Sequence, residues 1–123
     1  MPRILMVDGD PDVVHAGRTI LENHGMMVDE ARGIGETLAR CGEWSPDLVY
    51  IDVMHRQPAE GVSIAEQIRA GGSDGVIMIL ATVDRSKGFF TYESDGSLAP
   101  VDIPEKPMEP AALVRAIEHV LGE

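Results

Sequence analysis

The sequence has a single cysteine, few basic residues and no long hydrophobic run. The one cysteine, Cys41, excludes a disulfide framework and a cysteine-based zinc site. Ten Lys and Arg residues stand against 21 Asp and Glu residues, for a formal net charge of −11. Nucleic acid is therefore not an expected partner, because binding to its phosphate backbone needs clustered basic side chains. The apolar stretch at residues 4–7 is far too short for a signal peptide or a membrane span, so we expect a cytoplasmic protein without a membrane partner.

The composition is sufficient for one folded domain. The chain has 123 residues, of which 44% are hydrophobic, and this content argues against disorder despite the high charge. Because compact domains most often have about 100–150 residues, we expect a single domain over residues 1–123.

Short apolar runs alternate with helical patterns along the chain. The predicted strands, typical of strands buried on both faces, cover residues 4–7, 26–28, 48–51, 76–80 and 101–103. Asp10 and Pro11 are typical of the N-cap and first residue of a helix. The alternation predicts βαβ units, a parallel sheet of about five strands and a three-layer α/β fold. Residues 86–100 have few periodic apolar positions and are predicted to be mostly irregular.

Polar residues follow several predicted strands at the edge where such sheets bind ligands. They are Asp8, Gly9 and Asp10 after the first strand, Asp52 after the third, Ala81 and Thr82 after the fourth, and Lys106 after the last. Clustered carboxylates favour a hard cation such as Mg²⁺. Mg²⁺ and a lysine are the charges that phosphoryl transfer requires, and an aspartate can be the nucleophile that forms an acyl phosphate.

Simpler explanations exist for some of these residues. Asp10 and Asp12 suit the capping of a helix, Thr82 suits an ordinary strand end, and Lys106 suits a solvated surface charge. Asp8 and Asp52 directly follow apolar runs, which favours a functional role for both.

Three segments resemble the receiver domain of two-component response regulators. They are ILMVDGDPD at residues 4–12, PDLVYIDVM at residues 46–54, and EKP at residues 105–107. The resemblance implies a flavodoxin-like (βα)₅ fold, with a five-stranded parallel sheet in the order 2-1-3-4-5. It implies transfer of a phosphoryl group from a histidine kinase or a phosphotransfer protein to Asp52.

The same resemblance implies roles for other residues. Asp8, Asp52 and the backbone carbonyl of Met54 would bind Mg²⁺, and Lys106 would pair with the phosphoryl group. A receiver of this kind is a signalling domain and not an enzyme, beyond its own phosphorylation and dephosphorylation. Its downstream protein target is not indicated.

The sequence also departs from the family pattern. Gly9 replaces the second acidic residue, which predicts weakened Mg²⁺ binding unless Asp10 becomes a ligand. Ala81 stands at the place of the switch hydroxyl, with Thr82 one residue later. The polar, Gly-containing segment after Lys87 predicts an irregular or shortened fourth helix.

Two other functions are compatible with the residues. Gly9 and Ala81 favour a pseudo-receiver that is not phosphorylated and acts as a binding module. The order of Asp8, Asp10, Thr82 and Lys106 also resembles that of haloacid-dehalogenase-like phosphatases. Asp8 would then be the nucleophile and Asp10 the general acid of a small Mg²⁺-dependent phosphohydrolase.

Overall fold

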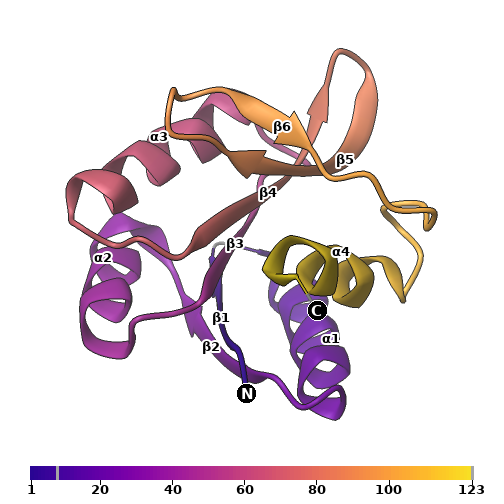
Figure 1. The fold of residues 1–123 in the computed structure, drawn as a ribbon, viewed down its shortest axis with the longest axis horizontal. Helices are drawn as coiled ribbons and strands as arrows, with labels where there is room; N and C mark the ends of the chain where they lie inside the picture. Colours follow the sequence, from indigo (N-terminus) through magenta and orange to yellow (C-terminus); the bar gives the residue numbers. More distant parts are fainter. Residues whose placement is uncertain (8, 123) are drawn as a thin grey trace.

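The computed structural model describes residues 1–7 and 9–122, which form a six-stranded sheet and four helices. The elements in chain order are β1 (Arg3–Val7), α1 (Pro11–Asn23), β2 (Met27–Ala31), α2 (Gly33–Trp44), β3 (Leu48–Asp52), α3 (Pro58–Ala70), β4 (Val76–Val83), β5 (Ser86–Tyr92), β6 (Leu98–Pro100) and α4 (Ala112–Leu121). Helices α1 and α4 lie together on one side of the sheet, and α2 and α3 on the other (Figure 1). The predicted three-layer, flavodoxin-like α/β fold is confirmed.

The apolar runs are continuous because the central strands are covered on both faces. Along β3, Leu48 and Tyr50 pack into the cluster beneath α1 and α4, whereas Val49 and Ile51 pack into the cluster beneath α2 and α3. Strands β2, β1, β3 and β4 are neighbours in that order and pair in parallel. Their carboxyl ends therefore meet at one rim of the sheet, as predicted.

The first helix begins where the sequence predicted. Asp10 is the N-cap, and its carboxylate accepts the N–H of Asp12 at 2.9 Å. Pro11 follows at the first helical position, where it costs no hydrogen bond.

The segment after β4 is a β-hairpin, so the expected irregular segment or shortened fourth helix is wrong. β5 pairs antiparallel with β4, and β6 pairs antiparallel with β5. Phe89 and Phe90 supply the reason: successive side chains of a strand point to opposite faces, and both rings are buried, one in each cluster. Between α3 and α4, the described residues form no helix.

The predicted fifth parallel strand over residues 101–103 is also wrong. β5 occupies the place beside β4 that this strand would have taken, so the full order is β2-β1-β3-β4-β5-β6 instead of five parallel strands. Val101 donates its N–H to the carbonyl of Phe89 at 2.8 Å, but the ladder ends there. Val101 and Ile103 pack instead against the cluster beneath α1 and α4.

No helix among the described residues is long and apolar enough to cross a membrane.

Candidate functional site

Asp52 ends β3 at the carboxyl rim of the sheet and is partly exposed. Its Oδ1 accepts the N–H of Met54 at 2.9 Å, which orients the carboxylate. Asp52 lines a cavity of about 360 Å³ together with residues of the β1–α1 and β3–α3 loops and the start of α1. The other lining residues are Gly9, Asp10, Val13, His55 and Arg56.

Two acidic residues from the β1–α1 segment were predicted beside Asp52. Asp8 lies outside the described residues, so its place in the site stays a prediction. Asp10 does line the cavity, but its Oδ1 is also the helix cap that accepts the N–H of Asp12. Asp10 is therefore a helix cap and also a neighbour of Asp52, whereas its role as a metal ligand stays a prediction.

The packing of Val14 leaves no room for a side chain at Gly9. A Cβ atom at this position would approach Cγ2 of Val14, on the first turns of α1, to 2.5 Å. Because Val14 is itself buried in the core, a carboxylate at position 9 would require Val14 to move.

Thr82 and Met54 connect the ends of β4 and β3. The Thr82 hydroxyl donates to the Met54 sulfur at 3.4 Å. Thr82 is therefore close to the segment that follows β3, although it does not line the cavity around Asp52. The role of the Met54 carbonyl as a metal ligand stays a prediction.

Lys106 lies in the exposed segment between β6 and α4. Neither the lining of the Asp52 cavity nor the ion pairs formed by the described residues include it. The preceding residue, Glu105, turns inward and pairs with Arg115 of α4 at 3.1 Å. The structure thus anchors this segment to α4, and the pairing of Lys106 with a phosphoryl group stays a prediction.

Two residues of the site were missed by sequence reasoning. His55 and Arg56 line the cavity with Asp52, and Arg56 pairs with Glu60 of α3, with 3.5 Å between Nε and Oε2. Both residues could have been predicted from their closeness in sequence to Asp52, because a short loop keeps them near the end of β3.

The chemistry of the donors suits a hard cation. Oxygen ligands from carboxylates are what Mg²⁺ prefers, and two carboxylates, Asp10 and Asp52, line one cavity. Within residues 1–7 and 9–122, no three His, Cys, Asp or Glu residues come together as a group that could hold a metal ion.

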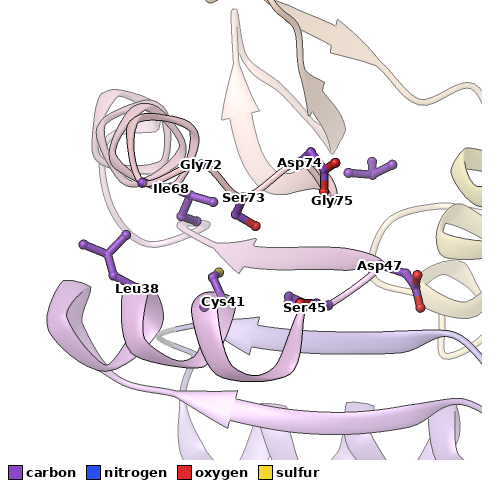
Figure 2. A pocket seen from close by; sticks show the side chains of 13 residues that line it. Leu38, Cys41, Ser45, Asp47, Ile68, Gly72, Ser73, Asp74 and Gly75 are labelled. Carbon is purple, nitrogen blue, oxygen red and sulfur yellow. The ribbon is translucent and has the colours of Figure 1, made fainter.

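A larger cavity lies at the opposite end of the sheet and has a volume of about 580 Å³. Figure 2 shows Leu38 and Cys41 of α2 facing Ile68 of α3 across it. Burial raises the pKa of the Cys41 thiol, which keeps it protonated and unreactive. This cavity is at the amino ends of β3 and β4, whereas ligands of such sheets bind at the carboxyl ends.

Comparisons with known proteins identify response regulators as relatives of this chain. The model of the response regulator receiver domain family matches residues 4–118. MtrA, a DNA-binding response regulator of Mycolicibacterium smegmatis, is 31% identical over 93% of this chain, and the chain spans only 49% of MtrA. Several other curated relatives, including ResD of Bacillus subtilis, are likewise about twice as long as the chain.

PilH of Pseudomonas aeruginosa matches along its whole length. It is 27% identical, with 99% of each chain covered. Among solved structures, one of histidine kinase ThkA in complex with response regulator protein TrrA matches with 30% identity and a TM-score of 0.57, covering 70% of this chain and 75% of the matched chain. The family match spans the sheet, the strand-end acids and most of α4, and on this basis the chain belongs to the response regulator receiver domain family.

Proposed function

We propose that the chain receives a phosphoryl group on Asp52 from the phosphohistidine of a histidine kinase or a phosphotransfer protein. The observation that carries the proposal is the Asp52 carboxylate, which lines an open cavity while the N–H of Met54 holds its Oδ1. A carboxylate oriented by one oxygen leaves the other free to act as a nucleophile. The kinase named in the ThkA–TrrA complex supports a donor of this class.

The transfer is a substitution at phosphorus. An oxygen of Asp52 forms the new O–P bond as the P–N bond of the donor breaks. The bonding electron pair stays on the imidazole nitrogen. With the other ring nitrogen of the donor already protonated, the products are an acyl phosphate on Asp52 and a neutral histidine on the donor. The Met54 N–H keeps the attacking carboxylate in place, and the open cavity admits the donor imidazole.

A divalent cation is part of the proposal. Asp52 and Asp10 of the described residues, together with Asp8 and the Met54 carbonyl, are the groups that would hold Mg²⁺. A bound Mg²⁺ neutralises charge on the phosphoryl oxygens. Because the second acidic position is Gly9, we expect binding to be weaker than with a full set of carboxylates. The proposal retains the cytoplasmic location expected from the sequence.

A phosphorylation-silent binding module is the second candidate. It is favoured by the packing of Val14 against Gly9 and by the engagement of Asp10 as a helix cap. The phosphohydrolase hypothesis has no comparable support, because the family match is to receiver domains.

Incubation with acetyl phosphate or phosphoramidate and Mg²⁺ distinguishes the candidates. We expect a mass increase of one phosphoryl group in the wild type and in Asp74→Asn, an exposed acid at the opposite end of the sheet. Asp52→Asn should show none. An unmodified wild type, with these donors and with histidine kinases, would establish the silent module, and an adduct on Asp8 would establish the phosphohydrolase.

A further inference from the structure

The antiparallel strand β5 brings a lysine to the same rim as Asp52. Because β5 runs opposite to β4, its first residues lie beside the carboxyl end of β4. Lys87 is there, directly opposite Thr82 in the register of the two strands. The chain has only two lysines, and Lys106 is in the exposed segment before α4.

Side-chain alternation places Lys87 on the same face of the sheet as Asp52. Tyr50, Leu80 and Phe89 belong to the cluster beneath α1 and α4. Asp52 and Lys87 lie two residues beyond Tyr50 and Phe89 toward the rim, and strand side chains repeat their direction every two residues. Both side chains therefore stand on the face covered by α1 and α4.

The contact between Tyr50 and Phe89, two residues farther from the rim, shows that side chains on β3 and β5 can meet across β4. In the strand register, Phe89 lies opposite Leu80, which is itself opposite Asp52, so the Tyr50–Phe89 pair runs diagonally across β4. Its ring centroids are 6.3 Å apart. Asp52 and Lys87 form the same diagonal moved two residues toward the rim.

The separation suits a long side chain. The Cα atoms of Asp52 and Lys87 are separated by two strand spacings of about 4.8 Å each across the sheet. Along the strands they are separated by two residues, each with a rise of about 3.3 Å. The flexible four-carbon stem of lysine lets its ammonium group move across such a gap. Lys87 takes part in none of the ion pairs of the described residues, and a phosphoryl group would extend Asp52 toward it.

We propose that Lys87, and not Lys106, supplies the ammonium group that pairs with the phosphoryl group on Asp52. The inference rests on the proposed phosphorylation of Asp52 and assigns a further residue to that site. Arg56 is the competing cation, but it is paired with Glu60 at the start of α3.

The turn that positions Lys87 is strained, which is common beside functional sites. Asp84 and Arg85 link β4 to β5 with φ angles of 50° and 68°. A positive φ angle is unfavourable for a residue with a long side chain such as Arg85, whereas aspartate tolerates it better. The strained turn fixes the register in which Lys87 lies opposite Thr82.

The two lysines allow a direct test by NMR. With ¹³C-labelled lysine, the chain gives two Cε–Hε signals, and the spectrum of Lys106→Met assigns them. Upon addition of beryllofluoride and Mg²⁺, we expect the Lys87 signal to shift and the Lys106 signal to stay, with neither moving in Asp52→Asn. Movement of Lys106 alone, or of neither lysine while the Met54 amide shifts, would overturn the assignment.

Phosphorylation kinetics give an independent readout. Lys87→Met should slow phosphorylation by acetyl phosphate about ten- to a hundredfold, the range for a lost hydrogen bond to a charged group. Lys87→Arg should restore part of the rate, and Arg69→Met, which removes a cation at the far end of α3, should leave it unchanged. A larger loss in Lys106→Met or Arg56→Met than in Lys87→Met would contradict the assignment while leaving phosphorylation of Asp52 intact. A wild type that is never phosphorylated would overturn both proposals.

Discussion

Gly9 and Val14 form a complementary pair beside Asp52. The space that a side chain at position 9 would need is filled by a methyl group of Val14, which lies 2.5 Å from the point that a Cβ atom would occupy. The absence of a carboxylate at position 9 is therefore coupled to the packing of Val14 in the core. A test of this coupling needs substitutions at both Gly9 and Val14.

We predict that Gly9→Asp destabilises the protein by about 1–3 kcal/mol, the usual cost of overpacking. The double variant Gly9→Asp with Val14→Ala should be more stable than the sum of the two single changes predicts, and it should bind Mg²⁺ more tightly than the wild type. Urea unfolding and Mg²⁺ titration measure both effects. Gly35→Asp is the control, because a Cβ there meets nothing within 4 Å. Additive unfolding free energies would contradict the coupling.

The β4–β5 connection is the element that sets this chain apart. A two-residue hairpin with positive φ at both positions has the form of a type I′ turn, which favours Asn-Gly or Asp-Gly. Here the turn is Asp84-Arg85, so the second position has a side chain where glycine is preferred.

We predict that Arg85→Gly raises the free energy of unfolding by about 1 kcal/mol, since it removes the penalty of a side chain at positive φ. Arg32→Gly makes the same chemical change at a residue whose φ is −123°. It should give no such gain. Urea unfolding of the two variants provides the comparison, and an equal effect in both would refute the explanation.

The same element shows what could be predicted from the sequence. Strands β1, β3 and β4 were predictable because each is a short apolar run, buried on both faces, that leads into polar residues. The hairpin was not, because its first turn lacks the glycine that marks such turns and because Phe89 and Phe90 are adjacent instead of alternating with polar residues. At the site, Asp52 could be selected from its position after a strand. Lys87 could not, since the expected fifth strand lay elsewhere in the chain.

At the scale of the whole molecule, the net charge of −11 lowers stability through repulsion between acidic side chains. Most ion pairs among the described residues are partly exposed, so they offset little of this repulsion. Salt should therefore matter more for this protein than for one of balanced charge.

We predict that raising the NaCl concentration from about 10 mM to about 150 mM, which shortens the Debye length from about 30 Å to about 8 Å, increases stability by roughly 1 kcal/mol. Thermal unfolding should show an increase in Tm of roughly 4 °C. MgCl₂ at the same ionic strength should stabilise the wild type further, but not Asp52→Asn. Equal responses of the two proteins to MgCl₂ would indicate that screening alone is at work.

The hairpin also affects how the sheet assembles. A parallel strand beside β4 must be reached through a long crossover, whereas β5 follows β4 after two residues and β6 follows β5 after five. Contacts between segments so near in sequence lower the contact order and close small loops, which form quickly. Strands β5 and β6 can therefore pair onto β4 one after the other, without contacts between segments that are distant in sequence. Strand β5, which contains Lys87, is the first to pair.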